Sequence, residues 1–316
     1  MEQWRANKRV LSKFFHSYLY VPRETSCTVT WTLLDFRHIL VMSLQENGLA
    51  RIIAVANQKG GVGKTTTAVN LASCLAAVDQ RTLLVDCDSQ ANATAAIGFA
   101  KDPSRRTLYH ALILNEPTDK IIQKSQVDSL DVVPADKNLA GAAVELVTSE
   151  NREYRLQAFL QPLLPQYKFV ILDCPPALDL LTLNALVTAN SVLVPIQCEY
   201  LALEGVSELL DTLMRIRRTL NPSLEIEGIL LTMYDERTTL SRQVATDLRS
   251  FFGTQVFQSV IPRNVRLAEA PSFGKPIIFY DMHSKGAEGY TQLAQEVIAN
   301  AEKRLGTGAR SAHSGA

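Results

Sequence analysis

Short runs of apolar residues alternate with segments of helical periodicity from Arg51 onward. This alternation is typical of βαβ units stacked around a parallel sheet. The runs hold few polar residues, which predicts strands covered on both faces. We therefore expect an α/β fold, doubly wound around a mostly parallel sheet. The predicted strands are 52–56, 82–86, 130–133, 169–173, 191–196, 228–233 and a short one near 256–260. The predicted helices are 65–78, 151–160, 180–188, 205–220, 241–252 and 286–305.

The limits of this alternation divide the chain into three regions. Residues 49–305 form the predicted α/β domain, and the small and polar residues 306–316 are expected to be a disordered tail. Residues 1–48 show no sustained helical or strand period. They are either a poorly ordered extension that precedes a true start at Met42, or a segment with a short basic helix near 10–18 that touches DNA.

Charge and cysteine content exclude several classes of function. The 316 residues include 32 Lys plus Arg and 32 Asp plus Glu, so any DNA binding requires a local patch. The five cysteines are scattered without a C-x-x-C pair, which argues against a disulfide framework or a thiolate metal site. Because no apolar run is long enough to span a bilayer and no secretory signal is recognisable, we expect a cytoplasmic protein.

A glycine-rich loop lies between the first predicted strand and the first predicted helix. Glycines in this context let backbone N–H groups converge on phosphate oxygens, and the helix adds the positive end of its dipole. We expect Lys64 to hold the β- and γ-phosphates of a nucleotide, and Thr65 to place its hydroxyl on Mg²⁺. Gln58 stands where the usual P-loop has its first glycine. The whole loop reads Gln58-Lys59-Gly60-Gly61-Val62-Gly63-Lys64-Thr65-Thr66.

Three aspartates lie where predicted strands end. Asp86 and Asp88 close the second strand at its carboxyl edge, where open α/β sheets place their ligands. The two carboxylates share one side if the strand continues to Asp88, because alternate strand residues face the same way. Asp173 ends the apolar run 169–172. A strand-end turn or a helix cap would also explain these positions, and for Asp86 that explanation competes with a role in metal binding.

The loop K-G-G-x-G-K-[ST] resembles the deviant Walker A loop of the family that contains ParA, Soj, MinD and the nitrogenase iron protein. The resemblance implies a P-loop ATPase that uses ATP and Mg²⁺ as a switch, with the whole loop from Lys59 to Thr66 around the nucleotide. It implies that Lys59 reaches across a dimer to the phosphates of the other subunit. It also implies that Asp88 positions the attacking water, that Asp86 supports the metal region, and that Asp173 is the Walker B aspartate that orders Mg²⁺.

Segments beyond the loop are similar to ParA/Soj chromosome or plasmid partitioning ATPases in particular. By this resemblance, Pro262 and Asn264 pack on the adenine base, while Arg237 and Arg266 contact DNA. The family further implies an ATP-dependent homodimer, binding of double-stranded DNA without sequence preference, association with the nucleoid, and a ParB-type partner that stimulates hydrolysis. The segments are 89–94, which departs from the family at Ser89 and Ala91, and 195–205, 231–235 and 261–272.

Three other functions share parts of this pattern. The alternative is a MinD-like membrane-associated positioning ATPase, which needs a terminal helix with a basic face and a bulky apolar face. Here the apolar positions of the last helix, such as Tyr290 and Leu293, look like an ordinary core stripe. An iron–sulfur carrier needs clustered thiolates, whereas Cys87, Cys174 and Cys198 are isolated in the sequence. A ligase such as dethiobiotin synthetase has a related fold but lacks the partition-type segments.

Overall fold

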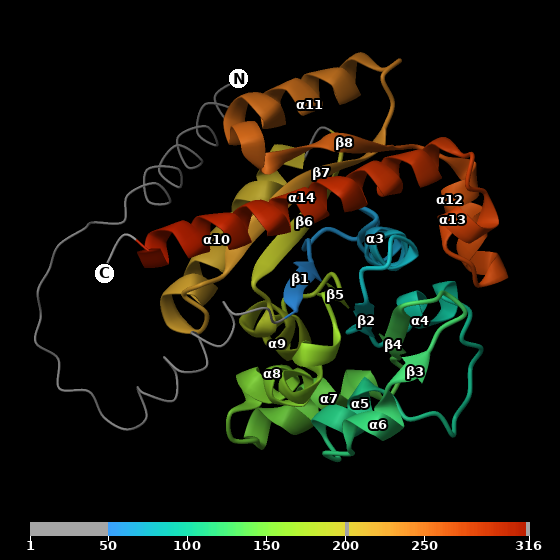
Figure 1. Cartoon of the computed structure of the whole chain (residues 1–316), viewed down its shortest axis with the longest axis vertical. Coiled ribbons are helices and arrows are strands. Elements are labelled where there is room, and N and C mark those ends of the chain that lie inside the picture. Colours follow the sequence, from blue (N-terminus) through green and yellow to red (C-terminus); the bar gives the residue numbers. More distant parts are fainter. Residues whose placement is uncertain (1–49, 200–201, 314–316) are drawn as a thin grey trace, which may run out of the picture.

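The computed structural model describes residues 50–199 and 202–313, with the backbone alone for 202–204 and 305–313; the predicted extension therefore lies outside the described residues. Within them, eight strands form one sheet in the order β3-β4-β2-β5-β1-β6-β7-β8 (Figure 1). All neighbours are parallel except β3, which is antiparallel to β4. The predicted mostly parallel sheet is confirmed. The strands are β1 Arg51–Val55, β2 Thr82–Asp86, β3 Gln123–Lys124, β4 Leu130–Val133, β5 Phe169–Asp173, β6 Ser191–Gln197, β7 Glu225–Tyr234 and β8 Val256–Pro262.

Helices cover both faces of the sheet. Helices α3 Lys64–Ala77 and α14 Lys285–His313 contact each other and pack on one face (Figure 1). The opposite face is covered by α9 Leu180–Thr188, α10 Ala202–Thr219 and α11 Thr239–Phe252. The shorter helices are α4 Asn92–Ala96, α5 Leu108–Leu112, α6 Thr118–Ile121, α7 Leu139–Glu145, α8 Arg155–Leu160, α12 Val265–Glu269 and α13 Ile277–Tyr280. The 3₁₀ turns are η1 Leu146–Thr148, η2 Arg152–Tyr154, η3 Gln161–Gln166, η4 Gly253–Gln255 and η5 Ala270–Phe273.

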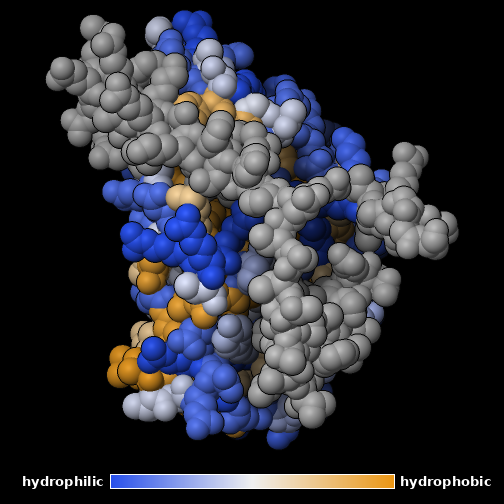
Figure 2. All heavy atoms as spheres, turned by 90° about the vertical axis from the view of Figure 1, so that its left-hand side faces the viewer, coloured by the Kyte–Doolittle hydropathy of each residue, from blue (hydrophilic) through white to orange (hydrophobic). Residues whose placement is uncertain are grey.

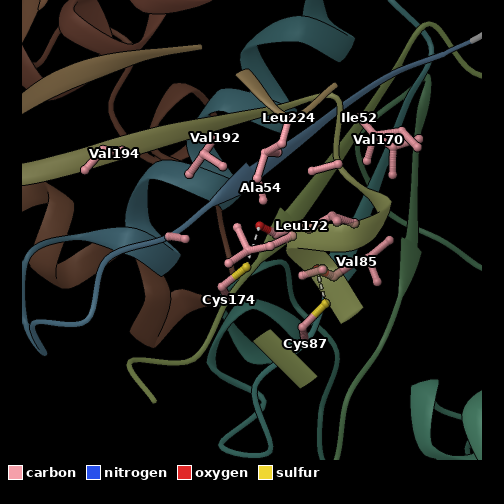
Figure 3. Close-up of a cluster of buried hydrophobic side chains, with 14 of the residues drawn as sticks. Ile52, Ala54, Val85, Cys87, Val170, Leu172, Cys174, Val192, Val194 and Leu224 are labelled. Atoms are coloured by element: carbon pink, nitrogen blue, oxygen red, sulfur yellow. Dashed lines mark hydrogen bonds between the residues drawn. The ribbon is translucent and has the colours of Figure 1, made fainter. Parts of the chain in front are cut away.

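Successive residues of the central strands face two different cores. Ile52 and Ala54 belong to the core on the α9 and α10 side, part of which is drawn in Figure 3. Ile53 and Val55 belong to the core beneath α3 and α14. All four side chains are buried. Burial on both faces is the reason that the strands read as unbroken apolar runs, as predicted.

Some element ends differ from the prediction. Strands β2, β4 and β5 and helix α9 coincide with their predicted ranges. The predicted helix 151–160 is the turn η2 followed by α8, and the predicted end of the last helix at 305 is wrong, because α14 continues to His313. Extending an existing helix needs no new nucleus, and α14 includes residues 306–313. The predicted disorder of the tail 306–316 stays a prediction. Strand β3 and helices such as α4 are too short to show periodicity in the sequence.

The side of the molecule that lies on the left of Figure 1 faces the viewer in Figure 2. Its described surface is mostly hydrophilic, with small hydrophobic areas between the polar ones. Among the described residues, no helix has both the length and the apolar character needed to cross a bilayer.

Candidate functional site

The glycine-rich loop joins β1 to α3 at the carboxyl edge of the sheet, between the neighbouring strands β5 and β6. Gly61 and Gly63 have φ angles of 75° and 87°, which glycine adopts without the steric cost of a side chain. Gly63 is also the N-cap of α3, whose first turn contains no acidic residue. No carboxylate of that turn therefore neutralises the positive end of the helix dipole. The predicted strand–loop–helix arrangement is confirmed, and it is the geometry of an anion-binding site.

Lys64 lies at the base of this loop, and only 7% of its surface is exposed. Its Nζ donates a hydrogen bond to the backbone oxygen of Lys59 at 2.9 Å. Burial lowers the pKa of the ammonium group, and the nearby carboxylate of Asp173 opposes that shift. A buried ammonium group is costly unless anions surround it. The position of Lys64 therefore suits a group that holds phosphate oxygens.

Asp173 is fully buried at the end of β5, opposite Val55 of β1 in the strand register. Neither of its carboxylate oxygens has a hydrogen-bond partner among the described residues, although the Thr65 hydroxyl is near enough to oppose its pKa shift. Burial, and then the charge of Asp86, raise the pKa of Asp173 well above its ordinary value. A bare buried carboxylate beside a hydroxyl offers the oxygen ligands that Mg²⁺ prefers. Asp173 and Thr65 therefore fit Mg²⁺, which would neutralise charge on the phosphates.

Asp86 and Asp88 do not share a strand side, because β2 ends at Asp86 and Asp88 lies in the following loop. One Asp86 oxygen accepts hydrogen bonds from the backbone N and the hydroxyl of Thr94 at 2.8 and 2.7 Å. The other accepts from the Asp88 backbone N at 3.1 Å. Burial raises the pKa of Asp86 to about 6, and these hydrogen bonds oppose the rise. Asp86 thus fixes α4, which favours the strand-end explanation over direct metal binding.

Thr94 is a site residue that the sequence pattern did not single out. Its hydroxyl donates to Asp86 and accepts a hydrogen bond from the Ala135 backbone N at 2.9 Å, so it joins β2, α4 and the segment after β4. The resemblance of 89–94 to a family motif includes this residue. That motif was the available signal, whereas the contact with Ala135 depends on the tertiary fold.

The Lys59 side chain contacts a residue outside its own loop. Its side chain is 40% exposed, and its Nζ forms an ion pair with Glu199 at 3.4 Å. Its backbone N is held by the Asn57 side chain at 3.0 Å. The two lysines of the loop therefore occupy different environments, because Lys64 is buried whereas Lys59 is partly exposed and paired with Glu199.

Pro262 and Asn264 lie at the end of β8 and just beyond it. Asn264 caps α12, because its side-chain oxygen accepts a hydrogen bond from the Arg266 backbone N at 2.8 Å. Pro262 lines an open pocket of about 450 Å³ together with Tyr234 and Arg237. The contact of Pro262 and Asn264 with adenine stays a prediction.

The two arginines predicted to touch DNA are exposed but not free. Arg237 pairs with Asp235 at 2.8 Å, and Arg266 pairs with Glu269 at 2.9 Å and with Asp281 at 3.5 Å. The Asp235 pair is local in sequence, whereas the contact between Arg266 and Asp281 joins α12 to the segment after α13. Exposed ion pairs of this kind contribute little to stability, so phosphates can compete for both guanidinium groups.

The structure also bears on the alternative functions. Cys87 and Cys174 are buried in an apolar cluster (Figure 3), and burial raises the pKa of each thiol. The described residues contain no group of three or more His, Cys, Asp or Glu side chains placed to hold a metal ion. In α14, Tyr290, Leu293 and Val297 are buried in the core, as predicted. These apolar side chains are therefore unavailable for insertion into a membrane.

Nucleotide hydrolysis accounts for the glycine-rich loop, its buried lysine and the bare aspartate at the end of β5, and we assign the chain to the P-loop ATPases. Comparison with known proteins narrows this class. A family model described as an AAA domain matches residues 50–226. The chain is 52% identical over 250 residues to the chromosome partitioning protein ParA of Myxococcus xanthus. The matched region covers 79% of this chain and 88% of that protein. It belongs to the ParA/Soj family of chromosome partitioning ATPases.

Two further similarities agree with this assignment. The sporulation initiation inhibitor protein Soj of Bacillus subtilis is 52% identical over 252 residues, covering 80% of this chain and all of Soj. A crystal structure of cobyrinic acid a,c-diamide synthase from Mycobacterium smegmatis, with bound ADP and magnesium, superposes with a TM-score of 0.68 at 36% identity. That similarity covers 78% of this chain and 93% of the synthase. A fold shared with a synthase does not itself fix the chemistry.

Proposed function

We propose that this partitioning ATPase binds Mg-ATP as a switch: it dimerises on ATP, binds double-stranded DNA without sequence preference, and is reset by hydrolysis. In this proposal a ParB-type protein stimulates hydrolysis, and the ATPase works in the cytoplasm on the nucleoid. Asp88 orients the attacking water, which its place in the half-buried loop beside Asp86 supports. The name of the M. xanthus relative, chromosome partitioning protein ParA, supports a role in chromosome partitioning.

The observation that carries the proposal is the position of Lys59. Lys64 already contacts its own loop, whereas the Lys59 ammonium group is exposed and bound only to Glu199, itself 47% exposed, among the described residues. An ion pair between two exposed side chains contributes roughly 0–1 kcal/mol, so phosphates from a second subunit can displace Glu199. This exposed position supports the proposal that Lys59 serves the ATP site of a second subunit.

Replacing each lysine separately tests the dimer. Lys59→Ala is expected to bind Mg-ATP within about threefold of the parent, because its own site keeps Lys64, but to remain monomeric in size-exclusion chromatography with ATP. Lys64→Ala is expected to lose ATP binding, because the main cation at the β- and γ-phosphates is gone. Lys168→Ala changes an exposed lysine next to β5 and serves as the control.

Dimerisation of Lys59→Ala with the parental dependence on ATP would contradict the assignment of Lys59 to the second subunit. Loss of dimerisation in Lys168→Ala would show that the assay responds to any loss of positive charge.

The membrane alternative is tested with the parent protein in a sedimentation assay on anionic vesicles. ATP-dependent pelleting with vesicles but not with DNA would favour a MinD-like function.

The DNA proposal depends on Arg237 and Arg266, which are 86% and 54% exposed at the side chain. Each neutralised phosphate contributes about 0.9 to the slope of log affinity against log salt concentration, and a dimer presents every arginine twice. Arg237→Glu with Arg266→Glu is therefore expected to flatten the slope by up to about 3.6 and to weaken binding to all sequences alike. Duplex binding at several salt concentrations measures this change.

A matched charge control is Arg218→Glu with Lys168→Glu, which changes two exposed cations, one on α10 and one just before β5. An equal flattening of the slope in the control would mean that only net charge matters. An unchanged slope in the arginine pair would move the DNA site to other residues. Both variants are expected to dimerise on ATP, because none of the four residues lies in the phosphate loop.

A further inference from the structure

Two buried polar side chains outside the glycine-rich loop hold the backbone of that loop. Thr232 lies on β7, is 2% exposed, and donates its hydroxyl hydrogen to the backbone oxygen of Val62 at 2.9 Å. These two residues are 170 positions apart in the sequence. Asn57 is 6% exposed; its side-chain oxygen accepts from the Lys59 backbone N at 3.0 Å, and its amide donates to the Pro195 oxygen of β6 at 2.8 Å. The loop that follows β1 is therefore braced from β6 and β7.

The Thr232 contact fixes the direction of one N–H group of the loop. In a trans peptide unit, the C=O of one residue and the N–H of the next point in opposite directions. Because the Val62 oxygen is held toward β7, the N–H of Gly63 must point away from β7. Among the described residues, no backbone oxygen or side chain accepts a hydrogen bond from the Gly63 N–H. This free donor is the kind that binds an anion at a helix N-terminus.

The Asn57 contact acts in the same way at the start of the loop. Its side chain takes up the Lys59 N–H, while the Lys59 oxygen accepts the Lys64 ammonium group. The peptide units on both sides of Lys59 are therefore held by chain contacts. A glycine-rich segment without such contacts has many conformations, and ordering them would reduce the affinity for a ligand.

We propose that Thr232 and Asn57 are positioning residues for ATP, which keep the phosphate loop in its anion-binding shape. In this proposal they act through the peptide units of Val62 and Lys59, which their side chains hold. The competing explanation is that both are ordinary buried polar groups that stabilise the domain. The two explanations differ because a positioning residue affects ATP affinity beyond its effect on stability.

Conservative variants of Thr232 make the test. Thr232→Val keeps the shape but removes the hydroxyl, and it is expected to raise the Kd for Mg-ATP about tenfold, which corresponds to about 1.4 kcal/mol. KM is expected to rise similarly while kcat stays within about twofold, since the groups at the reacting phosphate are intact. Thr232→Ser restores a hydroxyl and is expected to return Kd to within about twofold of the parent.

Thr188→Val is the matched control. Thr188 is also 2% exposed, and its hydroxyl donates to a backbone oxygen, that of Asn184 in α9, at 2.7 Å. It is expected to lower Tm much as Thr232→Val does and to leave the Kd for Mg-ATP unchanged. Isothermal titration with Mg-ATP and thermal unfolding of all variants give both quantities.

Asn57→Ala provides an independent test if Thr232→Val folds poorly, and it is expected to raise Kd at least fivefold. The proposal is overturned if a folded Thr232→Val and Asn57→Ala bind Mg-ATP as tightly as the parent. It is also overturned if Thr188→Val weakens binding equally, or if Thr232→Ser binds no better than Thr232→Val. Each of these results would show that the two side chains only stabilise the domain and do not affect ATP affinity.

Discussion

At the scale of single residues, the carboxylates of Asp86 and Asp173 show how environment separates two residues of the same type. They are register partners on the neighbouring strands β2 and β5, and both are fully buried. Asp86 accepts three hydrogen bonds, whereas Asp173 accepts none from the described residues. A hydrogen-bonded carboxylate supports structure, while a bare one is costly unless a cation binds it. The free-energy cost of burying the Asp173 carboxylate without a partner therefore indicates that it serves to bind a cation.

Asp173→Asn is expected to stabilise the nucleotide-free protein by about 1–2 kcal/mol at pH 8 and to lose Mg-dependent hydrolysis. Burial raises the pKa of Asp173 above the value of the unfolded chain, so between these two pKa values the folded parent holds a proton that the unfolded chain releases near pH 4. The parent accordingly loses stability as pH rises from about 4 toward the folded pKa, and Asn does not. Thermal unfolding at several pH values measures the growing difference.

Asp86→Asn provides the comparison for this prediction. It removes an acceptor from a carboxylate that is already hydrogen-bonded, and it is expected to lower Tm near pH 7 because the Thr94 groups lose a partner. An Asp173→Asn variant that melts below the parent at every pH would show that its carboxylate is not under electrostatic strain.

At the scale of secondary-structure elements, the edge strand β8 depends on helix α14. The pairing of β8 with β7 shifts register between Ile229 and Leu231, which marks an irregularity in this ladder. There the carboxylate of Glu296 accepts hydrogen bonds from the backbone N of Gln258 at 2.9 Å and of Ser259 at 2.7 Å. It also accepts the Ser259 hydroxyl. A side chain of the helix thus satisfies backbone donors that the sheet leaves unpaired.

Glu296→Ala is expected to destabilise the domain by about 2 kcal/mol, because two backbone donors lose their acceptor and Ser259 is buried. Glu296→Gln keeps one acceptor oxygen and should lose roughly half as much. Glu302→Ala, at an exposed position of the same helix, is the control for helix propensity. Urea unfolding compares the three variants. Equal losses for Glu296→Ala and Glu302→Ala would mean that the hydrogen bonds of Glu296 to β8 contribute nothing to stability.

At the scale of the whole molecule, the proposed nucleotide site draws on four adjacent strands. The phosphate loop follows β1, Asp173 ends β5, Pro195 belongs to β6 and Thr232 belongs to β7. None of these four strands is an edge strand, and all four contribute side chains to both cores (Figure 1). Binding at this point therefore stabilises the domain as one unit, since unfolding of any of these strands destroys the site.

Mg-ATP at about 100 times its Kd is expected to stabilise the folded protein by about 2.7 kcal/mol, which raises Tm by roughly 5 °C or more. Omitting magnesium should reduce this shift, because the bare carboxylate of Asp173 then faces the phosphates without a cation. Thermal unfolding with ATP, with and without EDTA, measures both effects. Lys64→Ala is the control, and a parental shift in that variant would place the nucleotide elsewhere.

The sequence by itself determined the parts that depend on local pattern. Strands β2, β4 and β5 could be predicted because burial on both faces makes them unbroken apolar runs. The phosphate loop could be predicted because it needs glycines and a lysine at fixed spacing. Only the tertiary structure decided that Asp86 is hydrogen-bonded, that Asp173 is bare and that Thr232 holds Val62. Such contacts join strands that are adjacent in the sheet but distant along the chain. Their presence depends on register and packing, which local patterns do not encode.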